Sequence, residues 1–103
     1  MKGSLHLVYR SPGEALALVQ CLNRVSEGDA LLLLESGVYG VLKAAKLAPR
    51  LTEAMPIISI YALAPDLAAR GIATDEILAG VGLVDYAGFV ELSVLYNPIV
   101  SWV

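Results

Sequence analysis

The chain alternates between short, strongly apolar runs and amphipathic stretches, which is the pattern of an α/β fold. In the clearest run, Gly28 and Asp29 form a turn signal, residues 30–34 are apolar, and Glu35 and Gly37 follow. Strands buried on both faces of a parallel sheet have this continuous apolar character. The pattern predicts strands over residues 5–9, 30–35, 57–63 and 81–85.

The segments between these strands carry helix signals. Ser11 is placed as an N-cap with Pro12 at the first helical position, apolar residues follow at helical spacing to about residue 26, and Gly28 ends the helix. Further helical segments are predicted at 38–46, 50–54, 65–71, 74–80 and 86–96. The last of these also suits a strand, and we prefer a helix capped by Asp85 because strands then alternate with helices throughout.

This order of elements predicts one α/β domain over residues 1–103, with three layers (α/β/α) and a mainly parallel sheet of four or five strands. Parallel strands need right-handed crossovers, so the loops after the strands share one edge of the sheet. Open α/β sheets place ligands and partners at that edge.

The composition is apolar for a globular domain. Hydrophobic residues make up 57% of the chain and charged residues 17%, against roughly 25% charged in average proteins, and the mean hydropathy is +0.69. We therefore expect a buried subunit interface. A membrane protein is not expected, because no uncharged run reaches the about 18 residues of a spanning helix. With one cysteine and no signal peptide at the N-terminus, the expected location is the cytoplasm.

The net charge is −3 and no basic stripe is present. Lys43, Lys46 and Arg50 are the nearest approach to one, and we expect them on one solvated helical face. Direct binding of nucleic acid is therefore not expected.

Cys21 is the only sulfur nucleophile that the sequence offers. It falls on the edge of the apolar stripe of its helix, so it is either half exposed or turned toward another subunit. A small structural hydrophobe is the favoured alternative. His6 has no partners at metal-ligand spacing, and we expect no metal; it could instead orient the edge loops by hydrogen bonding.

Three acids, Glu35, Asp66 and Asp85, lie at the ends of predicted strands and could converge as an acid–base group, although capping of the next helix is the commoner role of such residues. The sequence has no glycine-rich nucleotide loop and no Walker lysine, and we expect no cofactor.

Aromatic and aliphatic residues near the C-terminus predict an interface. Such side chains dominate the centres of protein interfaces. The alternative is that the segment after Pro98 folds back onto its own domain. We expect interface anchors at Tyr39, Tyr96, Ile99 and Trp102.

Four segments together resemble one family: residues 28–40, 60–71, 84–92 and the final Ser101-Trp102. They are similar to the DsrH/TusB family, the small subunits of cytoplasmic sulfur-relay complexes. The resemblance implies a DsrE/F/H-like (YchN-like) fold and a heterohexamer with DsrE/TusD-like and DsrF/TusC-like siblings. Such complexes pass persulfide sulfur between carrier proteins, for 2-thiolation of the tRNA wobble uridine or for sulfur oxidation.

In that family the main sulfur-carrying cysteine belongs to the DsrE/TusD subunit, after the third strand. Residues 62–64 hold the comparable place here and include no cysteine. Cys21 matches a cysteine in the first helix of DsrH-type members, which tilts the resemblance toward sulfur oxidation. The resemblance thus implies a structural or regulatory, non-catalytic subunit. Two alternatives stay open: a sulfurtransferase using Cys21, and a stand-alone homo-oligomer that binds a small molecule at the strand-end loops.

Overall fold

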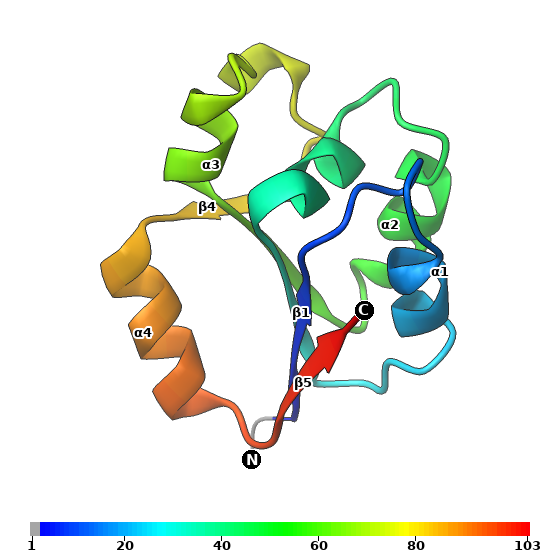
Figure 1. Ribbon diagram of the computed structural model, residues 1–103. Helices are drawn as coiled ribbons and strands as arrows, with labels where there is room; N and C mark the ends of the chain where they lie inside the picture. The colour runs from blue at the N-terminus through cyan, green and yellow to red at the C-terminus, as the bar shows by residue number, and fades with distance from the viewer. Residues whose placement is uncertain (1–2) are drawn as a thin grey trace.

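The computed structural model describes residues 3–103 and contains one parallel sheet (Figure 1). Its strands are β1 (Leu5–Val8), β2 (Ala30–Leu33), β3 (Ser59–Leu63), β4 (Gly82–Val84) and β5 (Ile99–Trp102). Their order across the sheet is β4-β3-β2-β1-β5, and every neighbouring pair is parallel. The carboxyl ends of the strands therefore lie at the same edge of the sheet, as predicted.

Helical segments connect the strands and cover both faces of the sheet. The α-helices are α1 (Ala17–Leu22), α2 (Ala48–Ala54), α3 (Ala64–Ala69) and α4 (Tyr86–Leu95), and the 3-10 helices are η1 (Glu35–Val41) and η2 (Thr74–Glu76). In Figure 1, α1 and α2 lie on one side of the sheet and α4 lies on the other. The predicted three-layer α/β/α class is confirmed, with five strands.

Two apolar clusters form the core, one on each face. Side chains alternate between the faces of a strand, so neighbouring leucines of β2 serve different clusters. Leu31 and Leu33 pack with Leu18 of α1 and Leu51 of α2. On the other face, Leu32 packs in a cluster with Leu92 of α4. Burial of each such side chain contributes about 1.5–3 kcal/mol.

The first helix is shorter than predicted, because α1 begins at Ala17 rather than at Pro12 and ends at Leu22. Ser11 is not its N-cap. Its hydroxyl accepts from the N–H of Gly13 at 3.2 Å, and its carbonyl accepts from the N–H of Glu14 at 2.9 Å. These local bonds close a turn, and serine readily offers the backbone this alternative to a helix.

The helix predicted at 38–46 is also wrong. The 3-10 helix η1 ends at Val41, and Leu42 then forms an antiparallel bridge with Ile77. Lys43 and Lys46 consequently lie before α2, while Arg50 lies within it, so the three cations do not share one helical face. Pro49 stands in the first turn of α2, where its missing N–H costs nothing.

The segment after Pro98 folds back onto its own domain as β5, which pairs with β1 from Leu5↔Ile99 to Val8↔Trp102. The helix at 86–96 is confirmed as α4. Asp85 caps it as predicted, because its Oδ1 accepts from the N–H of Gly88 at 2.8 Å. Within residues 3–103, none of the helices has the length and apolar character required to cross a bilayer.

Candidate functional site

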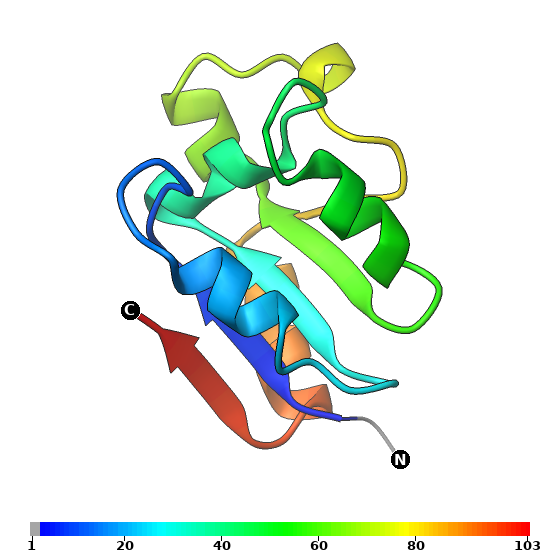
Figure 2. The same ribbon diagram turned by 90° about the vertical axis from the view of Figure 1, so that its right-hand side faces the viewer.

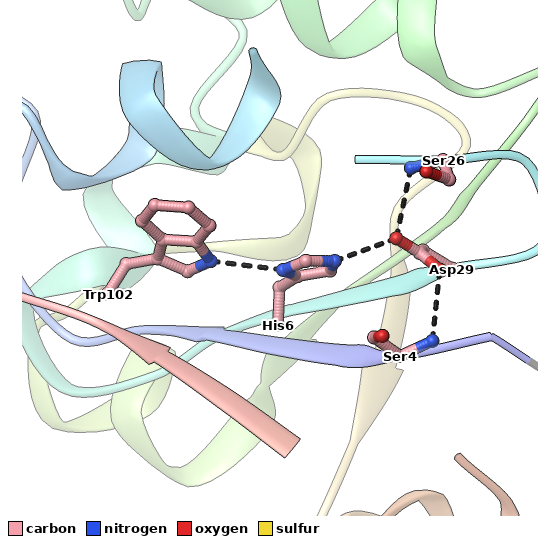
Figure 3. Close-up of polar contacts among 5 residues, drawn as sticks. All are labelled: Ser4, His6, Ser26, Asp29 and Trp102. Atoms are coloured by element: carbon pink, nitrogen blue, oxygen red, sulfur yellow. Dashed lines mark hydrogen bonds and ion pairs between the residues drawn. The ribbon is translucent and has the colours of Figure 1, made fainter. Parts of the chain in front are cut away.

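His6 lies at the centre of a buried polar network on the α1 side of the sheet. Its side chain is 5% exposed. Trp102 donates its indole Nε1–H to Nδ1 of His6 at 3.0 Å, and Nε2 of His6 lies 2.8 Å from Oδ2 of Asp29 (Figure 3). An indole nitrogen only donates, so Nδ1 must be the bare acceptor. The ring is therefore neutral, with its hydrogen on Nε2 directed at Asp29.

Asp29 ties two backbone segments together, directly before β2. Its Oδ1 accepts from the N–H of Ser4 at 2.9 Å, and its Oδ2 accepts from the N–H of Ser26 at 3.0 Å. Burial by itself raises the pKa of the Asp29 carboxyl, but the hydrogen bonds from Ser26, His6 and Ser4 outweigh it and hold the pKa below its ordinary value. Asp29 is thus a buried carboxylate at neutral pH.

Trp102 connects this network to α1 and β5. The His6 and Trp102 rings are stacked, with centroids 6.1 Å apart and planes at 26°. The indole packs against the first core cluster and lines an open recess of about 260 Å³ with Gln20, Asn23 and Arg24. Through these contacts Trp102 holds the C-terminal end of β5 against β1.

Cys21 is fully buried on α1, and neither exposed outcome predicted for it is found. Burial raises the pKa of its thiol to about 12, with a further contribution from the charge of Asp29. Both ring nitrogens of His6 are bonded to other residues, so no cysteine–histidine pair forms. In this conformation Cys21 is a protonated, inaccessible thiol and not a nucleophile.

The acids at the carboxyl edge do not form a catalytic group. The carboxylate of Asp66 accepts from the backbone N–H of Glu35, and that of Asp85 caps α4. The carboxylates of Asp66 and Asp85 therefore bind backbone N–H groups, in the first case that of Glu35 itself. Within residues 3–103, no three histidine, cysteine or acidic side chains are grouped to hold a metal ion.

The four predicted interface residues differ in how far their side chains are exposed to solvent. Tyr96, directly after α4, is buried in the second core cluster at 5% exposed, whereas Ile99 on β5 is 48% exposed and Trp102 is half-buried. Tyr39 is 40% exposed and lines a groove with a volume of about 410 Å³. Leu16, Val19, Lys46 and Leu47 are among the other residues of this groove.

Helix α4 exposes an apolar surface that sequence reasoning missed. Its inner side packs on the sheet through Phe89, Leu92 and Tyr96. Its outward residues are Tyr86, Ala87, Val90, Glu91, Val94 and Leu95, which we call the α4 outer face. Val94 is 78% exposed and Val90 61%. The sequence did hold a signal, because apolar residues run around the whole helix instead of forming one stripe.

Asp29 was not among the predicted site residues either. An acid directly before the most buried strand, next to a strand that holds the lone histidine, was the available signal. The pairing register of β1 and β2 does not by itself reveal the hydrogen bond between His6 and Asp29, since His6 lies opposite Leu31.

Comparisons with known proteins identify relatives along nearly the whole chain. A family model described as "DsrH like protein" matches residues 10–98. Protein TusB of Pectobacterium parmentieri is 39% identical over 98 residues, which cover 95% of this chain and 99% of the relative. Protein TusB of Escherichia coli (strain K12) is 39% identical over 100 residues with the same coverage.

Solved structures share the architecture at much lower identity. The ychN protein from E. coli superposes with a TM-score of 0.85 at 13% identity, covering 99% of this chain and all (100%) of that chain. MTH1491 from Methanobacterium thermoautotrophicum superposes with a TM-score of 0.76 at 14% identity, covering 97% of each chain. At such identities the likeness concerns the fold alone.

Proposed function

The protein belongs to the DsrH family, and on that premise we propose that it is a structural subunit of a cytoplasmic sulfur-relay complex. Its partners in this proposal are DsrE/TusD-like and DsrF/TusC-like siblings in a heterohexamer, together with a sulfur donor or acceptor carrier protein. The relatives named TusB favour 2-thiolation of the tRNA wobble uridine as the pathway served. Cys21, which matches a cysteine in the first helix of DsrH-type members, is the one residue that favours sulfur oxidation instead.

The α4 outer face is the observation that carries the proposal. It presents Tyr86, Val90, Val94 and Leu95 to solvent, each more than half exposed, and Glu91 is its one charged residue. Burial of one such side chain against a partner contributes about 1.5–3 kcal/mol, so exposure of four is costly for a chain on its own. Large apolar patches of this kind mark protein interfaces.

The state of Cys21 supports a non-catalytic role within the complex. A sulfur carrier attacks as a thiolate and needs access to a protein partner. Cys21 has neither property in this structure. In the proposal, the sulfur therefore travels on a cysteine of a sibling, and this chain supplies contact surface.

Native mass spectrometry of the tagged protein isolated from its host tests the assembly. The expected result is co-purification with two small related subunits, one of which carries additional sulfur. Val94→Lys would place a charge on the most exposed apolar residue of the α4 outer face and should abolish co-purification. The matched control is Glu53→Lys on α2, which covers the opposite face of the sheet and should leave the complex intact. Recovery of the wild-type chain alone would contradict the proposal.

Sulfur transfer by the assembled complex distinguishes this role from that of a sulfurtransferase using Cys21. The Cys21→Ala variant should support the same rate of transfer to the acceptor as the wild-type complex. A loss of transfer in a complex that still assembles would instead assign the carrier role to Cys21.

The groove beside Tyr39 favours a second candidate function, binding of a small molecule at the carboxyl edge. Its volume of about 410 Å³ lies within the usual range for ligand sites, about 300–1,000 Å³, and its walls are mostly apolar. A bound organic molecule in protein recovered without siblings would support this candidate. Release of that molecule by Leu16→Lys, with Glu53→Lys as control, would locate it in the groove.

A further inference from the structure

We propose that His6 acts as a protonation-sensitive latch for strand β5: the neutral ring holds Trp102 on the sheet, and the imidazolium releases it. The proposal stands on the geometry of the network and does not require the sulfur-relay function. His6 is the only histidine of the chain and Trp102 its only tryptophan, so the two partners of the latch can be observed separately.

The hydrogen positions decide the outcome of protonation. Nε2 of His6 carries the ring's one hydrogen and directs it to Asp29, while the lone pair of Nδ1 accepts from Trp102. A proton from solvent can therefore bind only at Nδ1, the atom that Trp102 uses. Two N–H groups would then face each other across 3.0 Å, where no hydrogen bond can form.

The surrounding charges determine which partner the imidazolium keeps. Asp29, from the turn before β2, offers a carboxylate at 2.8 Å and gains a charge-assisted bond when His6 becomes a cation. On α1 the Cys21 thiol is neutral, and two residues after α1 ends, the cation of Arg24 is exposed beside the Trp102 recess. The ring therefore stays with Asp29, and Trp102 loses its acceptor.

Strand β5 is the element that this loss can move. It lies at the edge of the sheet, and β1 is its one strand neighbour within the described residues (Figure 2). Its burial alternates between exposed and half-buried positions, whereas β1 is buried throughout. Edge segments with few buried contacts open at lower free energy than core strands. Protonation should thus free β5 while β1 to β4 stay folded.

Release of β5 would also change the surface that the protein offers to a partner. Ile99 and Trp102 are two of the predicted interface residues, and both belong to β5. This consequence rests on the proposed function, whereas the latch itself does not. Failure of the complex to form would leave the latch intact, and an immobile β5 would leave the complex intact.

Tryptophan emission of the full chain between about pH 8 and about pH 5, the range in which histidine titrates, tests the latch. We expect the emission maximum to move to longer wavelength as Trp102 enters water, while the helical far-UV circular dichroism signal is retained. The midpoint should coincide with that of the His6 ring proton resonance measured by NMR. Exchange of the β5 amides should accelerate on the order of tenfold relative to the Leu32 amide in the same sample.

Two variants separate the latch from general effects of acid. His6→Asn leaves an acceptor near the position of Nδ1 but cannot titrate in this range, so its emission should not change with pH. Tyr9→Phe removes a different, exposed contact to β5, the 3.4 Å approach of the Tyr9 hydroxyl to Ser101, and should keep the wild-type transition. No shift in the wild type, an equal shift in His6→Asn, or a simultaneous loss of circular dichroism would each overturn the proposal.

Discussion

Trp102 donates a hydrogen bond to His6 across 3.0 Å, although 96 positions separate the two residues in the sequence. The bond is partly buried and joins the sheet's edge strand to its neighbour. It also fixes which nitrogen of His6 carries the hydrogen, so it links the position of β5 to the protonation of a single ring.

Replacement of the Trp102 indole should measure the strength of this link. Trp102→Phe keeps an aromatic ring but leaves Nδ1 of His6 without its donor, so we expect the free energy of unfolding to fall by about 1–3 kcal/mol. Urea denaturation followed by circular dichroism gives this quantity. Tyr9→Phe is the control, since its hydroxyl contact with Ser101 is exposed and its loss should change stability by less than about 0.5 kcal/mol. Equal effects of the two variants would mean that the indole bond adds nothing.

Asp29 should make the protein sensitive to acid. Because folding lowers the pKa of this carboxyl, the stabilisation is fully present above the unfolded value of about 4 and is lost as the pH falls through the lower folded value. Asp29→Asn should therefore be less stable than the wild type at pH near 7, and the two stability curves should converge toward about pH 2. Urea denaturation across this range is the measurement. An Asp75→Asn control, at an exposed position on η2, should follow the wild-type curve.

Cys21 should resist thiol reagents while the protein is folded. With its pKa raised to about 12 and no exposed surface, the thiol offers almost no thiolate at neutral pH. We expect alkylation by iodoacetamide to be at least about 100-fold slower in the native protein than in urea. Equal rates would show that α1 opens readily and would reopen a carrier role for this residue.

Gly37 should be intolerant of any side chain. A Cβ at this position would overlap the carbonyl oxygen of Val8, which belongs to β1 and cannot move as a flexible side chain would. We expect Gly37→Ala to cost roughly 1–3 kcal/mol, measured by urea denaturation. Gly13→Ala is the matched control, because the nearest atom to its added Cβ is the Ser11 hydroxyl at 3.7 Å. A similar stability of both variants would contradict the close approach of η1 to β1.

The parts of the fold that the sequence predicts are those with a local physical cause. The apolar run before Glu35 is only five residues long and lies between turn signals, which favours a strand covered on both faces over a buried helix. Asp85 caps α4 through an oxygen only three residues from its donor, which is a relation visible in the sequence. Parallel pairing then follows from strands alternating with helices.

The parts that the sequence does not predict depend on distant partners. Residues 42–43 look helical, but the Val41 carbonyl accepts from the N–H of Leu78 and the Lys43 N–H donates to the carbonyl of Glu76. This pairing outweighs the local helical preference. Strand β5 exists only because β1 offers it a free edge. Cys21 sits on the edge of a helical stripe in projection, yet the structure buries it completely.

The placement of β5 beside β1 has a consequence for how the chain folds. Strands β1, β2 and β3 pair in sequence order, so each pairing closes a short loop. The contact between Leu5 and Ile99 instead closes a loop of nearly the whole chain, which costs more entropy and slows its formation. We therefore expect the sheet to grow outward from β1, β2 and β3, with β5 the last strand to join and the first to leave.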